Sequence, residues 1–288
     1  MMNDPIIILA VSSMRSLISQ PRPLLCNHSS AADIFNICFI NVSIIFSIMK
    51  GMSFVDPNQF VISRKRKKYK FAKFHNAENC FEFDEWRDFY QQHQPGIFGL
   101  EIGAGTGLFS VELAARYPDK LFAAIDVKAD RLQKGAYTAL EKGLSNIYFI
   151  RARADQVGDL FALSTLVNIW VTFPDPFPKK RAAGRRLTHP YFLRRYAQLL
   201  QPGGELLFKH DDRDFFCWSL EQLVAEKWQI AELSFDLHES SLDDEYKIMT
   251  TYEQRWLNEG KAINFVKATY SASGSGLALA STLPSNVK

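Results

Sequence analysis

Cysteine is scarce in this chain, and its placement excludes the sites that cysteines usually build. The 288 residues contain four cysteines, and no two of them form a Cys-x-x-Cys pair. Structural zinc sites need such closely spaced ligands, and disulfide-stapled domains are much denser in cysteine. Since the sequence shows no other cluster of metal ligands, we predict a metal-free protein with reduced thiols in the cytoplasm. The cysteines are Cys26, Cys38, Cys80 and Cys217.

Strong net charge and a membrane-length apolar run are missing as well. The formal net charge is +3, too close to neutral to indicate a nucleic-acid-binding protein by average composition, so local clusters matter more. The most apolar stretch, 34–49, is about 16 residues long, whereas a spanning helix needs roughly 20. No basic residue precedes the first apolar run at 6–11, which argues against a secretory signal. We therefore expect no membrane association.

The chain divides into regions of different composition. Residues 1–51 are apolar and rich in Ser and Asn, and an ordinary soluble composition starts at Met52. We interpret Met52 as the natural start and 1–51 as an atypical extension from a misassigned start codon. Residues 52–95 are expected to form a basic arm and a helix, and 96–268 the main domain. Residues 269–288, mostly small residues without periodicity, are expected to form a disordered tail.

The run 64–70 contains six Lys and Arg residues around Tyr69, with Lys73 close behind. Most charge runs are solvated, flexible surface segments, and that interpretation is favoured for this run taken alone. The alternative is an arm that contacts phosphates, with Tyr69, Phe71 and Phe74 interleaved between the cations.

Strand and helix signals alternate through the main domain. Such alternation indicates an α/β fold with a parallel sheet. In these sheets ligands bind beyond the carboxyl ends of the strands, so residues that follow each strand are the candidate functional residues. Strands are expected at 97–102, 121–125, 147–150, 166–172 and 205–209, with helices up to 117 and at 131–142.

The first strand runs into the turn Glu-x-Gly-x-Gly-x-Gly, formed by Glu101, Gly103, Gly105 and Gly107. Glycines let the chain turn sharply and bring its backbone close to a ligand. The spacing differs from the G-x-G-x-x-G of dinucleotide-binding proteins and suits a cofactor without phosphates. Nineteen residues after Gly107, Asp126 ends the second strand, where a carboxylate can accept hydrogen bonds from both ribose hydroxyls of an adenosine.

A third acidic residue, Asp155, follows the third strand, where it can contact an adenine amino group. In order and spacing the three positions resemble the class I S-adenosylmethionine methyltransferases. The resemblance implies a Rossmann-like α/β fold, with a mostly parallel seven-stranded sheet flanked by helices, and S-adenosyl-L-methionine as cofactor. An NAD(P)-dependent oxidoreductase is the main competitor, and the glycine spacing speaks against it.

A proline-rich, cationic segment follows the fourth strand. The sequence 173–181 reads FPDPFPKKR, and its three prolines deny helix or central-strand geometry to the backbone around Asp175. A rigid loop with surface charge is the plain interpretation. A dense cationic cluster beside a fixed acid favours a polyanionic partner instead. The cations are Lys179, Lys180, Arg181, Arg185 and Arg186.

This segment is similar to the FPDPWxKxR…RR signature of the bacterial tRNA (guanine-N7-)-methyltransferases. Further landmarks of that family recur in order at 200–204, 208–211 and 250–256, and the resemblance covers roughly residues 62–268. It implies methyl transfer from S-adenosylmethionine to N7 of a guanine in tRNA, the variable-loop guanine at tRNA position 46. Three departures from the signature are Phe177 in place of Trp, a thinner basic patch at 182–184, and His210 in place of Thr.

The resemblance also assigns roles to individual residues. Glu101, Asp126, Asp155 and Asp175 lie on the cofactor and catalytic side, Asp175 being the catalytic candidate. We expect His210 to be an ordinary hydrogen-bonded residue. Phe208, Phe215, Phe216 and Trp218 are assigned to the core, and so is Trp256 in preference to a base-stacking role. Substrate contacts fall to Lys179, Asp211, Thr250, Tyr252 and Glu253, and RNA-backbone contacts to Lys180, Arg181, Arg185 and Arg186.

Two other classes of function stay open from the sequence. One is a class I methyltransferase that acts on another RNA or on a protein, and the other is a non-catalytic RNA-binding protein with the same fold. The intact set of acidic residues argues against the second, because a binding module does not need a cofactor site. The oligomeric state, monomer or homodimer, is not encoded in any pattern that we recognise.

Overall fold

The computed structural model describes residues 54–62 and 65–270. All of them belong to one compact unit. The expectations for 1–51, for Met52 as the start and for the tail beyond 270 lie outside the described residues. Within the described part, no helix is both long enough and apolar enough to cross a bilayer.

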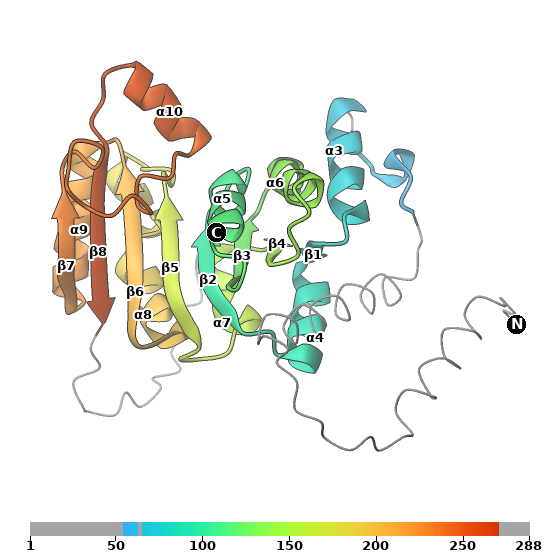
Figure 1. The fold of residues 1–288 in the computed structure, drawn as a ribbon, viewed down its shortest axis with the longest axis horizontal. Coiled ribbons are helices and arrows are strands. Elements are labelled where there is room, and N and C mark those ends of the chain that lie inside the picture. Colours follow the sequence, from blue (N-terminus) through green and yellow to red (C-terminus); the bar gives the residue numbers. More distant parts are fainter. Residues whose placement is uncertain (1–53, 63–64, 271–288) are drawn as a thin grey trace, which may run out of the picture. The chain divides into compact units, whose positions relative to one another are not determined.

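The centre of the fold is an eight-stranded sheet in the order β1-β4-β3-β2-β5-β6-β8-β7 (Figure 1). The pairs from β1 to β6 are parallel, and β8 runs antiparallel to both β6 and β7. A mostly parallel α/β sheet is therefore confirmed. The strands are β1 (Cys80–Glu82), β2 (Ile97–Ile102), β3 (Leu121–Asp126), β4 (Ile147–Arg151), β5 (Leu166–Thr172), β6 (Leu200–His210), β7 (Trp228–Ser234) and β8 (Asn264–Tyr270).

The strand count differs from the expected seven because of β1. This strand has three residues, lies directly before a helix and pairs in parallel with β4. A segment that short has no readable periodicity, so only its tertiary pairing marks it as a strand. The last strand, β8, runs to Tyr270, so the first two residues of the expected tail belong to the sheet.

Helices cover both faces of the sheet (Figure 1). On one face, α3 (Lys65–Asn76) and α5 (Leu108–Arg116) pack against α6 (Ala129–Glu141). The helices α4 (Phe83–His93), α7 (Val157–Leu160), α8 (Pro190–Leu199) and α9 (Arg213–Ala225) form the other layer. Helix α10 (Thr251–Asn258) lies at the carboxyl ends of β5 and β6 (Figure 1).

Burial of the central strands follows from this double cover. The first five residues of β3 and the last five of β5 are buried, the continuous apolar pattern of a strand covered on both faces. Aromatic contacts tie helices to strands: the rings of Phe109 and Trp170 lie 4.8 Å apart, and those of Phe208 and Phe216 lie 5.5 Å apart. Phe208, Phe215 and Phe216 are buried as predicted, whereas Trp218 is only half-buried.

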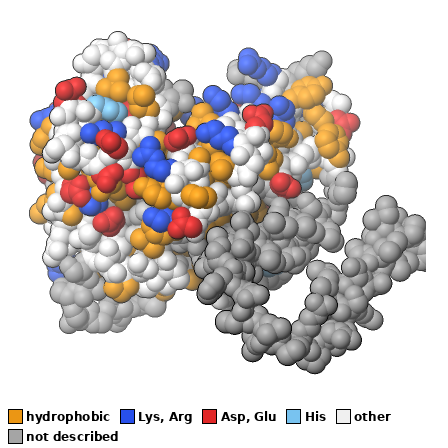
Figure 2. All heavy atoms as spheres, in the orientation of Figure 1, with side chains coloured by type: hydrophobic (Ala, Val, Ile, Leu, Met, Phe, Trp, Pro, Cys, Tyr) orange, Lys and Arg blue, Asp and Glu red, His pale blue; other side chains and the backbone are white. Residues whose placement is uncertain are grey.

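The basic run continues as α3, a helix docked on the main unit. Ala72 and Phe74 are buried, and Phe74 joins the core with residues of α6. Arg66 and Lys67 stay exposed, as does Tyr69. Figure 2 shows Lys and Arg side chains over this helix. Of the aromatics interleaved with the cations, Phe74 therefore serves the core, while Tyr69 remains open to solvent.

Candidate active site

The predicted acids gather at one edge of the sheet. Parallel strands end on the same side, so side chains that follow consecutive strands come close together. The register brings Thr172 of β5 next to Glu101 of β2, and places Lys209 of β6 opposite Thr172. The acids at this edge are Glu101 near the end of β2, Asp126 at the end of β3, Asp155 after β4, Asp175 after β5 and Asp211 after β6.

The glycine turn takes the shape that its sequence predicts. Gly103, Gly105 and Gly107 all have positive φ, between 58° and 75°, a backbone conformation that residues other than glycine rarely adopt. At Gly107 space is limiting too, since a Cβ would lie 2.6 Å from the Phe149 ring. At Gly105 a Cβ would meet nothing within 4 Å, so the middle of the turn is an open cradle.

Two further contacts hold the turn, and sequence reasoning missed one of them. The Asp126 carboxylate accepts hydrogen bonds from the amides of Gly105 (2.9 Å) and Lys128 (2.8 Å), and burial raises its pKa. The amide of Gly135 in α6 donates to the Thr106 carbonyl at 2.9 Å, and a Cβ on Gly135 would lie 2.4 Å from that oxygen. The signal for Gly135 was a glycine inside an otherwise ordinary helix.

Glu101 is buried at the junction of β2, α5 and β5. Its carboxylate accepts hydrogen bonds from the Ser110 hydroxyl (2.5 Å) and the Thr172 hydroxyl (2.7 Å). Burial raises its pKa from 4.5 to about 7, against the opposing effect of these bonds. Both carboxylate oxygens therefore hold β2 to α5 and β5, and a direct contact between Glu101 and the cofactor stays a prediction.

Lys209 is a buried cation that the sequence analysis did not single out. Its ammonium donates to the carbonyls of Tyr246 (2.9 Å) and Ile248 (2.8 Å) and to the Glu253 carboxylate (2.9 Å). Burial lowers the pKa of Lys209, while the neighbouring Glu253 raises it. The lysine thus ties β6 to the segment that leads into α10.

Glu253 and Thr250 close the first turn of α10 on themselves. The Glu253 carboxylate accepts from the Thr250 amide (3.1 Å), and the Thr250 hydroxyl accepts from the Glu253 amide (3.0 Å), forming a capping box. His238 adds a third partner, its Nε2 2.8 Å from Glu253 Oε1. Both predicted substrate residues are thus buried here and serve the fold, so their contact with a substrate stays a prediction. Tyr252, by contrast, is 44% exposed.

Asp175 lies on an unusual loop between β5 and η3 (Lys180–Arg185). Phe173 and Phe177 have left-handed φ values of 48° and 42°, a conformation that costs about 1–3 kcal/mol per residue and is often found at functional sites. Asp175 is exposed between them, and its carboxylate has no hydrogen-bond or ion-pair partner in the described part of the chain. An open, unpaired carboxylate is available to a ligand.

The cations after this loop divide into two groups. Lys179, Lys180 and Arg181 are exposed, and within residues 54–62 and 65–270 none has a salt bridge. Arg185 is also exposed, with its guanidinium 4.3 Å from the Phe177 ring centre. Arg186 is half-buried and donates to loop carbonyls, so its contact with RNA stays a prediction.

The remaining predicted residues are each engaged locally. His210 is buried and hydrogen-bonded as expected, with burial lowering its pKa. Asp211 lies 3.5 Å from the Lys261 ammonium. Asp155 is paired with Arg153, two residues earlier in the chain. Trp256 packs against the core, as expected, and carries the Lys261 ammonium 3.6 Å from its ring centre.

Comparison with known proteins decides the family. A family described as putative methyltransferases matches residues 96–266. A tRNA (guanine-N(7)-)-methyltransferase of Cytophaga hutchinsonii is 37% identical over 186 residues, 64% of this chain and 83% of that protein. The enzyme of the same name from Bacteroides thetaiotaomicron is 34% identical, covering 70% of this chain and 85% of its own. The chain belongs to the tRNA (guanine-N(7)-)-methyltransferase family.

Among solved structures, the 16S rRNA methyltransferase KamB aligns at 17% identity with a TM-score of 0.48, covering 66% of this chain and 94% of that one. The fold assignment does not depend on this likeness, because the strand order and helix layers establish it.

The cofactor of this methyltransferase family fits the residues present. The left-handed glycine turn leaves open space at Gly105, where a Cβ would meet no atom within 4 Å. Asp126 lies beside it with its carboxylate fixed by two amides, suited to ribose hydroxyls. These residues, with Gly103 and Asp155, are the ones that would hold S-adenosylmethionine.

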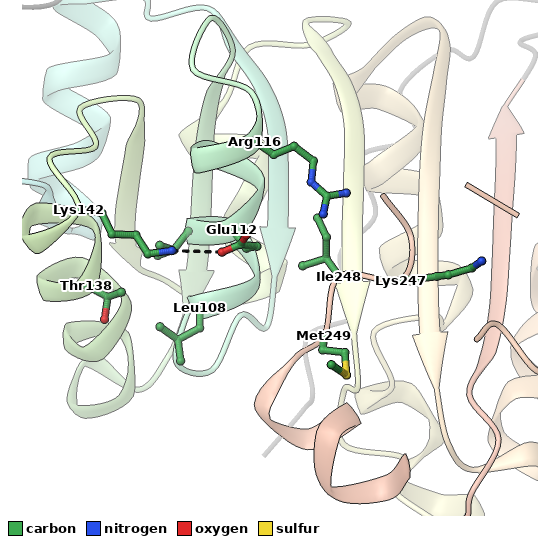
Figure 3. A pocket seen from close by; sticks show the side chains of 9 residues that line it. Leu108, Glu112, Arg116, Thr138, Lys142, Lys247, Ile248 and Met249 are labelled. Atoms are coloured by element: carbon green, nitrogen blue, oxygen red, sulfur yellow. Dashed lines mark hydrogen bonds and ion pairs between the residues drawn. The ribbon is translucent and has the colours of Figure 1, made fainter. Parts of the chain in front are cut away.

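A separate cavity of about 450 Å³ lies between α5, α6 and residues 247–249 (Figure 3). Leu108, Ile248 and Met249 supply apolar lining, and the Glu112–Lys142 ion pair (3.2 Å) lies at one side. None of the predicted site residues lines it.

Proposed function

We propose that this protein transfers the methyl group of S-adenosylmethionine to N7 of a guanine in tRNA, giving 7-methylguanosine. The observation that carries the proposal is the exposed, unpaired Asp175 on a strained loop, flanked by free cations. The relatives named tRNA (guanine-N(7)-)-methyltransferase support the same substrate.

The reaction asks for positioning rather than for a base. Guanine N7 has an exposed lone pair, so no proton has to leave before N7 attacks the methyl carbon. The bound cofactor supplies a methyl group activated by its sulfonium. The protein has to hold nucleophile, carbon and sulfur in line at near-attack distance, which is a large source of rate enhancement.

Asp175 is the best-placed acid for recognising the base. Asp211 is largely buried and faces Lys261, and Glu253 is bound by Lys209. Of these three acids Asp175 is the exposed one, and its carboxylate can accept hydrogen bonds from guanine N1–H and N2–H₂, donors that adenine does not present together. The same negative charge stabilises the positive charge that develops on the methylated ring.

The cations supply a surface for the RNA backbone. Lys179, Lys180 and Arg181 stand exposed next to Asp175. Helix α3 adds a second basic patch, with no acidic residue in its first turn to offset the cations there. These cations repel one another, and the phosphates of a bound RNA would neutralise them. We therefore assign both basic patches to tRNA.

Methyl transfer from labelled cofactor to unmodified total tRNA, followed by nucleoside analysis, tests the proposal. We expect 7-methylguanosine. Transcripts in which the variable-loop guanine at position 46 is replaced by adenine test the finer site and should accept no label.

Two alternatives predict other results. A methyltransferase for another RNA or for a protein would label those acceptors and leave tRNA unlabelled. A non-catalytic RNA-binding protein would show no cofactor binding by calorimetry.

Sedimentation with and without tRNA distinguishes the monomer from the homodimer. A cytoplasmic location, inferred from the tRNA substrate, is tested by cell fractionation.

A further inference from the structure

Two adjacent arginines, Arg185 and Arg186, make different contacts with the Asp175 loop. Arg185 is exposed and lies over the Phe177 ring. Arg186 donates from Nε to the Pro176 carbonyl at 2.9 Å and from Nη2 to the Phe177 carbonyl at 3.2 Å. Both would be assigned to RNA from sequence alone, but Arg185 is exposed, whereas loop carbonyls engage Nε and Nη2 of Arg186.

Two aromatic rings of α9 also lie against the Arg186 guanidinium. Its central carbon lies 4.3 Å from the Trp218 ring centre and 5.5 Å from that of Phe215. The two hydrogen bonds come from the edge of the group, and the rings of α9 pack against it. A planar fork that also stacks on aromatic rings is a property of arginine that lysine does not share.

The loop needs anchors of this kind because of its composition. Pro174, Pro176 and Pro178 have no backbone N–H, so the loop is poor in donors and has to be held mainly by its carbonyls. Left-handed residues at its two ends, Phe173 and Phe177, persist only when surrounding structure fixes them. Arg186 fixes the side that follows Asp175.

His210 fixes the side that precedes Asp175. The Asp212 amide donates to its Nδ1 at 2.8 Å, so the proton of the neutral ring is on Nε2. Nε2 then donates to the Pro174 carbonyl at 3.0 Å. Asp175 therefore lies between two carbonyls that are each held by a side chain from elsewhere in the chain.

We propose that Arg186, together with His210, acts as a positioning clamp that holds the Asp175 loop in its strained conformation, and that Arg186 is not an RNA contact. The inference rests on the proposed function, since it concerns how Asp175 meets the guanine. Misplacement of a reacting group by about 1 Å can lower a rate about 100-fold. Loss of the clamp should therefore lower kcat for methyl transfer, with little change in KM for tRNA.

The matched pair Arg186→Gln and Arg185→Gln separates positioning from RNA binding. We expect Arg186→Gln to lower kcat by about 100-fold. Arg185→Gln should instead raise KM for tRNA and reduce the salt dependence of binding by about one phosphate contact. Arg186→Lys keeps the charge without the fork and should not restore kcat. Restoration by lysine, or a change confined to KM and salt dependence in Arg186→Gln, would overturn the proposal.

A double variant tests whether Arg186 acts through Asp175. If it does, Asp175→Asn combined with Arg186→Gln should be no slower than Asp175→Asn alone, since groups that act as a unit are not additive. Additive losses would contradict the clamp.

Amide hydrogen exchange at Phe173, Asp175 and Phe177, the loop residues that carry a backbone N–H, gives a readout independent of activity. Exchange should accelerate in Arg186→Gln and stay as in the wild type in Arg185→Gln, with calorimetry confirming that cofactor still binds. The exchange rates test the clamp alone: unchanged exchange in Arg186→Gln would overturn it, whatever the activity of the wild type. Methylation of tRNA by the wild type tests the proposed function alone, and its absence would overturn only that function. If Arg186→Gln does not fold, Trp218→Leu removes the aromatic cover instead and should give the same accelerated exchange.

Discussion

The two halves of the carboxyl edge are built differently. On the side of β2 to β4, the glycine turn and Asp126 lie where the sequence order places them, and backbone amides fix the acid. On the side of β5, β6 and α10, charged side chains that look alike in sequence divide into open and buried ones, such as Asp175 and Glu253. Local backbone geometry governs the first half, and long-range contacts govern the second.

The largest expected effect concerns the buried pair on the second side. Lys209→Met leaves the Glu253 carboxylate without its cation in the interior, which typically costs about 3–5 kcal/mol of unfolding free energy. Urea unfolding measures it. Lys142→Met, which breaks the exposed pair with Glu112, is the control and should cost about 1 kcal/mol or less. Equal losses would mean that Lys209 has no special structural role.

Replacing both partners sharpens the test. In Lys209→Met combined with Glu253→Leu no buried charge is left alone, so the double variant should be more stable than Lys209→Met. A further loss of stability would instead show that the hydrogen bonds of Glu253 with the Thr250 amide and His238 outweigh the cost of its unpaired charge.

The second effect is the pH dependence that Glu101 confers on the first side. Its folded pKa, about 7, lies above the unfolded value near 4.5, so the protonated form is favoured by folding. Its contribution is fully present below pH 4.5 and is lost as the pH rises through 7, about 3 kcal/mol in all. Glu101→Gln removes this dependence. Unfolding curves of both proteins between pH 4.5 and 8 measure the difference, and parallel pH profiles would contradict it.

The third effect compares Asp175, an exposed acid on the second side, with Asp126, whose carboxylate is fixed by backbone amides on the first side. Asp175→Asn removes the charge that meets the guanine and should lower kcat about 100-fold, a change of about 2.7 kcal/mol in the barrier. Cofactor affinity by calorimetry should stay close to wild type, whereas Asp126→Asn should weaken it. A similar loss of cofactor affinity in Asp175→Asn would make Asp175 a cofactor ligand.

The smallest effect separates strain from crowding in the glycine turn. Gly107→Ala meets both a positive φ and the Phe149 ring, while Gly143→Ala has the same φ of 69° and nothing within 4 Å. We expect Gly143→Ala to cost about 1 kcal/mol and Gly107→Ala about 1–3 kcal/mol more, from overpacking. Thermal unfolding measures both, and equal costs would show that the Phe149 ring moves aside.

Much of the fold followed from local patterns. The strands at 97–102 and 166–172 match the prediction residue for residue, because continuous apolar runs bounded by turn residues are local signals. The three residues of β1 and the antiparallel pair β7 and β8 were not among the predicted strands. After its buried first residue, β7 alternates between exposed and half-buried residues. Its place in the sheet depends on its pairing with β8.

The sequence by itself determined the family, the order of the central strands β2 to β6, the glycine turn and the acids at the strand ends, since these depend on patterns along the chain. Only the tertiary structure decided which charged groups face inward. Lys209 meets Glu253 across 44 residues, and Arg186 reaches back to the carbonyls beside Asp175. Burial and pairing of a charge depend on what packs over it from distant segments, and spacing along the sequence does not record that.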